Sequence, residues 1–228
     1  MARNERFEKL VTHLTPKSAT SEMYRMLRTN LDFSSLDHPL HSVMVTSTVT
    51  GEGKTTTAAN LAVVNAQSGK NTIIVDGDLR KPMIHRIFQL SNIKGCTNVL
   101  LKQAELLEAI QPTQIPNLDV LTSGPLPPNP ADVIGSETMK KLIVSLTDVY
   151  DLVIIDSPPV LSVADVKLLS PSIDGILYVV GAGLVTRQAL KKAQQSLEMS
   201  GARILGTVLN RKKLSKSEQQ YYYYGYGN

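Results

Sequence analysis

Apolar, β-branched runs alternate with helical patterns along most of this chain. The strand-like runs are apolar at every position instead of every second one, which is typical of strands that are buried on both faces. Strands are predicted over 42–47, 71–76, 118–122, 152–156, 175–180 and 204–210. Helices are predicted over 54–68, 105–111, 136–150, 163–169 and 186–200. The pattern therefore predicts an α/β fold, a mainly parallel β-sheet with helices on both faces, in which ligands bind at the carboxyl ends of the strands.

The two ends of the chain lack this alternation. A helix is predicted over 20–33, because apolar residues recur at helical spacing after a candidate cap at Thr20 or Ser21. The polar residues before this helix are predicted to form an arm, and the glycine- and tyrosine-rich residues at the other end a flexible tail. The predicted arm, folded domain and tail cover 1–17, 18–214 and 215–228.

A glycine-rich loop follows the first predicted strand and opens the first long helix. Its sequence, TVTGEGKT over 48–55, matches the phosphate-loop pattern G-x-x-x-x-G-K-[ST] except that Thr48 replaces the first glycine. In a P-loop NTPase fold, Lys54 reaches the β- and γ-phosphates and the Thr55 hydroxyl binds Mg²⁺, while backbone N–H groups and the helix dipole hold the anion. The predicted nucleotide-binding residues are Gly51, Glu52, Gly53, Lys54, Thr55 and Thr56.

Three aspartates end two of the buried strands. Asp76 and Asp78 follow the second strand, and Asp156 ends the strand over 152–156. Buried carboxylates lose hydration unless they hold a cation, and Mg²⁺ prefers oxygen ligands. The predicted metal ligands are therefore Thr55, Asp78 and Asp156. Asp76 is left to act on a nucleophile. The reference pKa of an aspartate is about six units below that of a tyrosine, so Asp76 is a weak base, but a weak base is enough because phosphoryl transfer depends mainly on positioning.

Five of the last eight residues are tyrosine. Tyrosine rings favour burial, yet this segment has no apolar periodicity with which to pack. A tail that carries many phenolic hydroxyls is typical of a substrate. The candidate phosphorylation sites are Tyr221, Tyr222, Tyr223, Tyr224 and Tyr226.

Charge and composition narrow the choice of partners. The chain of 228 residues carries a net charge of +4, and the residues from Arg203 onward hold five basic groups and one acidic group, which accounts for all of it. The remaining body is neutral, which argues against nucleic acid as a partner. The basic segment before the tail either contacts an acidic membrane or partner surface or is only solvated. One cysteine, Cys96, and the lack of a long apolar run or signal sequence predict a cytoplasmic protein.

These motifs together resemble the bacterial tyrosine kinases of the P-loop type, the cytoplasmic kinases of capsular and exopolysaccharide operons. The resemblance covers nearly the whole chain. It implies an ATP- and Mg²⁺-dependent protein-tyrosine kinase that phosphorylates its own tyrosine cluster in trans and regulates polysaccharide synthesis and export. Lys54, Asp76 and Asp78 are then the catalytic residues.

The resemblance also implies partners. The family's E-x-x-R-x-x-R helix corresponds to Glu22, Arg25 and Arg28, which share one helical face. These residues are expected to join subunits into a homo-oligomeric ring, either an octamer or a ring with another number of subunits. A membrane-embedded activator, the polysaccharide co-polymerase, is expected to hold the kinase at the inner face of the membrane and to complete the adenine pocket. A protein-tyrosine phosphatase is expected to reverse the reaction. Asn210 is either an adenine contact or a strand-end turn residue.

Two other functions stay open from the residues alone. One is an ATPase of the partition or septum-placement type, without kinase activity. Val49 argues against it, because those ATPases carry a signature lysine at this position that reaches across a dimer. The other is a catalytically idle adaptor, which the intact set of Lys54, Thr55, Asp76 and Asp156 argues against.

Overall fold

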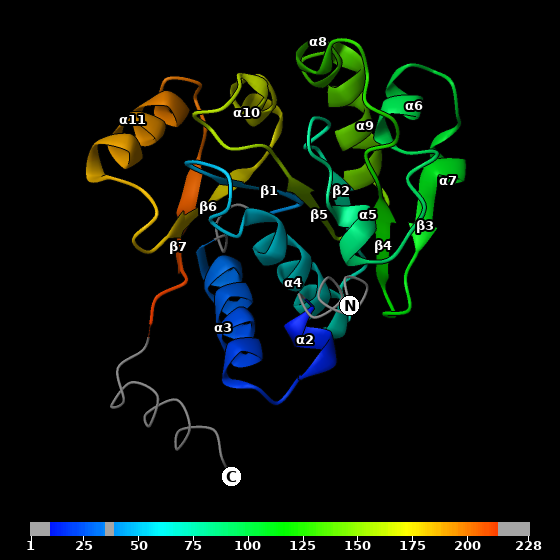
Figure 1. Cartoon of the computed structure of the whole chain (residues 1–228). Helices are drawn as coiled ribbons and strands as arrows, with labels where there is room; N and C mark the ends of the chain where they lie inside the picture. The colour runs from blue at the N-terminus through cyan, green and yellow to red at the C-terminus, as the bar shows by residue number, and fades with distance from the viewer. Residues whose placement is uncertain (1–9, 35–38, 214–228) are drawn as a thin grey trace, which may run out of the picture.

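A single seven-stranded sheet organises the chain in the computed structural model, which describes residues 10–34 and 39–213 (Figure 1). The strand order is β3-β4-β2-β5-β1-β6-β7. All neighbouring strands are parallel except β3 and β4, which are antiparallel. The strands are β1 (Ser42–Ser47), β2 (Thr72–Asp76), β3 (Ile110–Pro112), β4 (Leu118–Leu121), β5 (Leu152–Asp156), β6 (Gly175–Gly181) and β7 (Ile204–Asn210).

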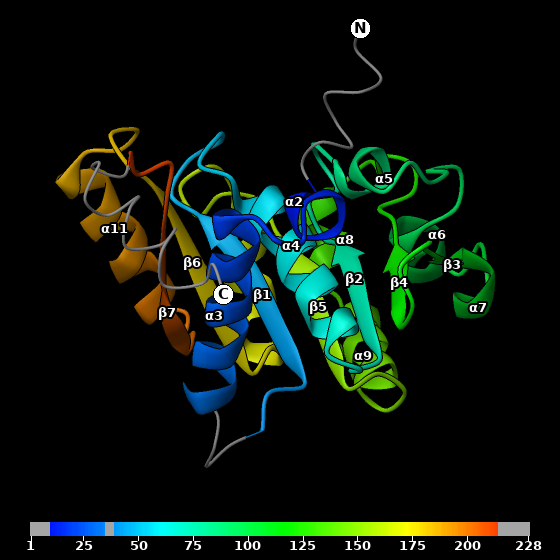
Figure 2. The ribbon, with the colours of Figure 1, turned by 90° about the horizontal axis from the view of Figure 1, so that it is seen from below.

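Helices cover both faces of this sheet, as the apolar strands predict (Figure 2). Strands β1, β2, β5 and β6 are buried at every position, so each contributes side chains to two apolar clusters. One face carries α3 (Ala19–Ser34), α4 (Lys54–Gln67) and α5 (Ile84–Ile87), and α2 (Val11–Leu14) packs on α3 and α4. The other face carries α6 (Cys96–Leu100), α7 (Leu106–Ala109), α8 (Pro130–Ile134), α9 (Glu137–Thr147), α10 (Asp165–Leu169), the 3-10 turn Ser170–Ser172 and α11 (Arg187–Glu198).

The central helix α4 is buried along most of its length, because α2 and α3 pack over it. Its buried Asn60 accepts hydrogen bonds from the backbone N–H (3.0 Å) and the hydroxyl (2.8 Å) of Thr12. Leu10 is only 1% exposed. Residues 10–14, which fall inside the predicted arm, therefore belong to the packed body. The rest of the predicted arm up to residue 9, residue 214 and the predicted tail over 215–228 lie outside the described residues.

Two local predictions need correction. The helix predicted over 105–111 ends at Ala109, and Ile110 begins the edge strand β3, which pairs with β4. Tertiary pairing at the sheet edge prevails over the local pattern there. Helix α3, predicted over 20–33, is capped by Ser18, whose hydroxyl accepts the N–H of Ser21 (3.2 Å), and not by Thr20 or Ser21.

The register brings the predicted aspartates together. Asp76 of β2 lies opposite Asp156 of β5, and Val45 of β1 lies on the other side of Asp156. The carboxyl ends of these strands therefore meet beside the loop that joins β1 to α4. Across the part of the chain that the structure describes, we find no helix with the length and apolar character needed to cross a membrane.

Candidate nucleotide-binding site

The loop between β1 and α4 has the backbone that an anion-binding loop requires. Gly51 and Gly53 adopt φ values of +94° and +101°, which side-chain-bearing residues rarely adopt. Gly53 immediately precedes α4, so the amide-rich N-terminus of a buried helix opens directly from the loop. This arrangement confirms the strand–loop–helix context predicted from the sequence. The replacement of the first glycine is accommodated because the Thr48 hydroxyl lies 2.7 Å from the Tyr178 hydroxyl, inside the fold.

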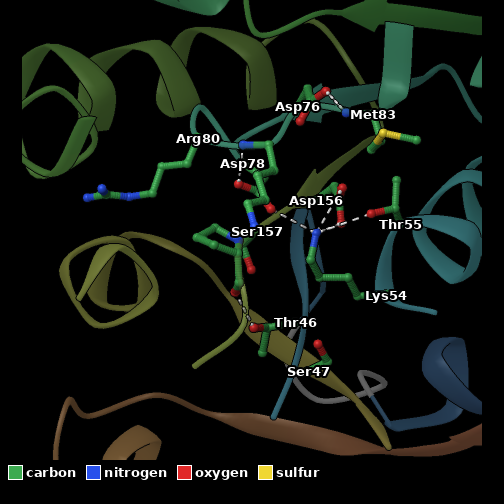
Figure 3. A network of polar contacts seen from close by, with 12 residues as sticks. Thr46, Ser47, Lys54, Thr55, Asp76, Asp78, Arg80, Met83, Asp156 and Ser157 are labelled. Atoms are coloured by element: carbon green, nitrogen blue, oxygen red, sulfur yellow. Dashed lines mark hydrogen bonds and ion pairs between the residues drawn. The ribbon is translucent and has the colours of Figure 1, made fainter. Parts of the chain in front are cut away.

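Lys54 lies between two carboxylates (Figure 3). Its Nζ is 3.1 Å from Asp78 Oδ2 and 3.4 Å from Asp156 Oδ1, and it donates a hydrogen bond to Thr55 Oγ1 at 3.1 Å. Burial alone would lower the pKa of Lys54, but the charges of Asp156, Asp78 and Asp76 outweigh it and raise that pKa. Burial raises the pKa of Asp156, which the Lys54 charge and the Thr55 hydroxyl oppose. The site therefore gathers a cation, a hydroxyl and two carboxylates at the base of the loop.

Asp76 joins this group from the end of β2. It is fully buried, and its Oδ2 accepts the backbone N–H groups of Met83 (3.0 Å) and Ile84 (2.9 Å). Its Oδ1 is buried without a hydrogen-bond partner. Burial and the neighbouring Asp156 charge raise the pKa of Asp76 to about 8. Asp76 therefore belongs to the carboxylate cluster but is not among the residues that line the cleft.

A cleft of about 910 Å³ opens over the phosphate loop. Its wall includes the loop and the start of α4, the segment after Asp78, and the loop that follows β5. Arg80, which also lines the cleft, donates to both oxygens of the buried Asp165 (3.0 and 3.2 Å). The predicted residues that line the cleft are Gly51, Gly53, Lys54, Thr55, Thr56 and Asp78.

Sequence reasoning missed the residues that connect the loop after β5 to strand β1. Thr46 Oγ1 donates to the Pro158 carbonyl (2.8 Å), and Ser157 donates from its backbone N–H and its hydroxyl to the Val45 carbonyl (3.1 and 3.0 Å). These bonds fasten the loop after β5 to β1, beside the cleft. Asp165, the partner of Arg80, carries no local pattern that would reveal it from the sequence.

The predicted oligomerisation residues face partners within the same chain. Glu22 and Arg25 pair at 2.6 Å along α3, Arg25 also donates to the Pro16 carbonyl (2.6 Å), and Arg28 donates to the Val64 carbonyl (3.1 Å). Arg28 thus fastens α3 to α4. A role between subunits stays a prediction. The five candidate phosphorylation sites, from Tyr221 to Tyr226, lie outside the described residues.

Comparison with known proteins decides the family. Residues 40–198 match the AAA domain. The chain is 47% identical over 224 residues to Tyrosine-protein kinase YwqD of Bacillus subtilis, which covers 98% of this chain and 94% of that protein. The chain belongs to the bacterial tyrosine-protein kinases.

Solved structures of this kinase family share the fold. The chimerical protein CapA2B2 superposes with a TM-score of 0.88 at 43% identity and covers 91% of each chain. The kinase domain of Escherichia coli tyrosine kinase ETK gives a TM-score of 0.87 at 34% identity, over 91% of this chain and 82% of that one. The septum site-determining protein MinD of Pyrococcus horikoshii, solved with Mg-ADP, is less similar, with a TM-score of 0.65 at 28% identity over 78% of this chain and 73% of that one. The tyrosine kinases are thus closer in structure than the septum-placement protein.

Proposed function

We propose that this protein is an ATP-dependent protein-tyrosine kinase that phosphorylates its own C-terminal tyrosine cluster and so regulates capsular or exopolysaccharide synthesis and export. The observation that carries the proposal is the position of Lys54, at the head of a phosphate loop and between the carboxylates of Asp78 and Asp156. Family membership supplies the reaction class, since YwqD, 47% identical, is a tyrosine-protein kinase by name.

The residues of the site fit ATP and Mg²⁺. Bound Mg²⁺ would supply positive charge that offsets the charge of the phosphates. Thr55, Asp78 and Asp156 offer a hydroxyl and two carboxylates, the oxygen donors that Mg²⁺ prefers, and the Lys54 ammonium and the loop amides supply positive charge for the phosphates. The left-handed backbone at the two loop glycines lets these amides turn toward an anion.

Asp76 is the proposed acceptor of the phenol proton. Its raised pKa makes the Asp76 carboxylate a stronger base than an ordinary aspartate, and only the ionised form of Asp76 can accept the phenol proton. Its burial under the Met83 and Ile84 amides means that a substrate reaches it only after this backbone moves. Asp78 lines the cleft without such a movement and also takes part in the proposed site, through its contact with Lys54.

The proposed cellular setting follows the same family. A membrane-embedded co-polymerase would hold the kinase at the inner face of the membrane and would complete the adenine pocket. The Asn210 side chain donates from Nδ2 to the Glu52 carbonyl (2.8 Å) and accepts the Arg211 N–H at Oδ1 (2.9 Å), which favours a strand-end turn role over an adenine contact. Transfer would occur in trans within a ring of subunits that are joined through Glu22, Arg25 and Arg28. The ring would be an octamer or contain another number of subunits. Each phosphate adds roughly −1.5 to −2 charge to the tail. Several phosphates near subunit contacts would repel one another and dissociate the ring until a protein-tyrosine phosphatase removes them.

Labelled ATP, Mg²⁺ and the activator's cytoplasmic segment provide the test. We expect phosphotyrosine within residues 221–226 of the full chain and none in Lys54→Met. Free phosphate without phosphotyrosine would instead support the ATPase of the partition type, and neither product would support the idle adaptor.

A mixing experiment distinguishes transfer in trans from transfer within one chain. The donor carries phenylalanine at all five tail tyrosines, and the acceptor is the full-length Lys54→Met variant. Phosphotyrosine on the acceptor supports transfer in trans, and an unlabelled acceptor refutes it. The particle sizes of the dephosphorylated and phosphorylated proteins test whether phosphorylation dissociates the ring. We expect a ring for the dephosphorylated protein and smaller species after phosphorylation.

A further inference from the structure

Glu52, which the sequence places among the nucleotide ligands, faces away from the cleft. It lies in the middle of the phosphate loop, yet its side chain is fully buried. Its Oε2 accepts the backbone N–H of Val49 at 2.8 Å, and its Oε1 accepts the backbone N–H of Gly181 at 2.9 Å. The carboxylate thus joins the start of the loop to the end of β6.

A second side chain fastens the same loop from β7. Asn210, the last residue of that strand, donates from Nδ2 to the Glu52 carbonyl at 2.8 Å. Its amide also lies against the α-carbon of Gly53, so closely that a methyl group there would clash with Nδ2. The backbone of Asn210 is fixed in turn, because its carbonyl accepts the N–H of Ala182 at 2.8 Å. The loop is therefore connected to the ends of both β6 and β7.

The chemistry of position 52 calls for a carboxylate. Two backbone N–H donors, from Val49 and Gly181, converge on one side chain, and each needs its own acceptor in the buried interior. A carboxylate provides two acceptor oxygens, whereas the carboxamide of glutamine provides one acceptor and one donor group. Glutamine would therefore leave an N–H group facing an NH₂ group, and alanine would leave both N–H groups without partners.

We propose that Glu52 is a positioning residue that holds the phosphate loop in its anion-binding shape, with Asn210 as its support from β7. Glu52 acts on the nucleotide through the backbone that it orients and not by contact. The remaining loop amides and Gly53 are then held ready for phosphate before the nucleotide arrives, which reduces the ordering required on binding. This inference rests on the proposed function only in that the protein must bind a nucleotide.

The experiment compares Glu52→Gln with Tyr178→Phe in the full-length protein. Tyr178→Phe is the matched control, because it removes a buried hydrogen bond to the Thr48 side chain of the same loop but leaves the amides of Val49 and Gly181 paired. Two quantities are measured: the Kd of Mg·ADP by calorimetry, and the hydrogen exchange of the Val49 and Gly181 amides without nucleotide. For Glu52→Gln we expect the Kd to rise about tenfold or more and at least one of the two amides to exchange at least about tenfold faster. For Tyr178→Phe we expect changes within about twofold.

The outcomes separate this inference from the proposed function. Wild-type protein that fails to bind Mg·ADP would contradict the proposed function. If wild type binds and Glu52→Gln binds equally well, the positioning role is refuted and the proposed function stands. Weaker binding with unchanged amide exchange would also refute it, because it would indicate direct contact with the nucleotide. Equal losses of Mg·ADP affinity in Glu52→Gln and Tyr178→Phe would also refute the positioning role, since they would indicate general destabilisation. In steady state the positioning role predicts a larger effect on the KM for ATP than on kcat.

Discussion

Replacing Asp76 by asparagine should change how the stability of the metal-free protein depends on pH. Burial and the charge of Asp156 raise the pKa of Asp76 to about 8, whereas an unfolded aspartate titrates near about 4. Between these values the folded state binds more protons than the unfolded state, so stability falls as the pH rises. The slope approaches about 1.4 kcal/mol per pH unit, which gives a loss on the order of 3 kcal/mol from pH 5 to pH 8.

Asp76→Asn removes this titration and keeps its main contacts. The amide oxygen can accept the Met83 and Ile84 N–H groups that Oδ2 accepts now. The new NH₂ group replaces Oδ1, which has no partner, so a constant penalty of about 1–3 kcal/mol is expected at every pH. The informative quantity is therefore the change of the difference between wild type and variant with pH, and not its value at one pH.

Urea unfolding in EDTA at pH 5, 6, 7 and 8 measures this difference. We expect the free energy of unfolding of the variant to increase relative to that of wild type as the pH rises, by on the order of 3 kcal/mol in total. Asp78→Asn is the control, because it removes the contact at 3.1 Å with Lys54 and should destabilise the protein at pH 7. A difference between wild type and Asp76→Asn that stays constant within about 0.5 kcal/mol over this range would refute the raised pKa of Asp76.

Three single positions carry further predictions. Gly53→Ala should weaken Mg·ADP binding and cost about 1–3 kcal/mol of stability, because φ is +101° and the new methyl group would clash with Asn210; unchanged calorimetric affinity and urea stability would contradict this. Arg80→Ala should cost about 1–3 kcal/mol in urea unfolding, because it leaves the buried carboxylate of Asp165 without its ion pair, and adding Asp165→Asn should recover part of the loss. Cys96, fully buried and with its pKa raised to about 12 by burial, should react slowly with thiol reagents at pH 8 in the native protein and rapidly in urea; equal rates would contradict its burial.

The sequence predicts the central part of the fold well because burial on both faces leaves a strong pattern. Strands β1, β5 and β7 have the bounds that their apolar runs predict. The edge strand β3 escapes prediction because its three residues are stabilised by pairing with β4 and not by their own pattern. The packing of Leu10 and Thr12 on α4 is hidden for a similar reason, since the partner lies 48 residues away in the case of Thr12 and Asn60.

The site shows the same division between local motif and distant contact. The phosphate loop predicts the position of Lys54 and Thr55 at the start of α4, because the motif places them after a strand and before a helix. The direction of the Glu52 side chain is not fixed in this way, because it depends on an amide of β6, 129 residues away. Likewise, the burial of Asp76 depends on the backbone of Met83 and Ile84, which fold back over it after the strand has ended.

The origin of the tyrosine tail bears on the choice between transfer in trans and within one chain. Arg211 lines the cleft, so the chain passes the rim of its own candidate active site shortly before the tail begins. Tyr221 follows Asn210 by 11 positions, and an extended chain of that length spans at most about 40 Å. Reach alone therefore permits both routes, and a tether this short gives a tail a high effective concentration at any cleft it can enter. A ring would give a neighbour's tail the same advantage, so dilution cannot separate the two routes. The two routes are separated only by mixing a chain that has Lys54 but lacks the tail tyrosines with a chain that has the tyrosines but lacks Lys54.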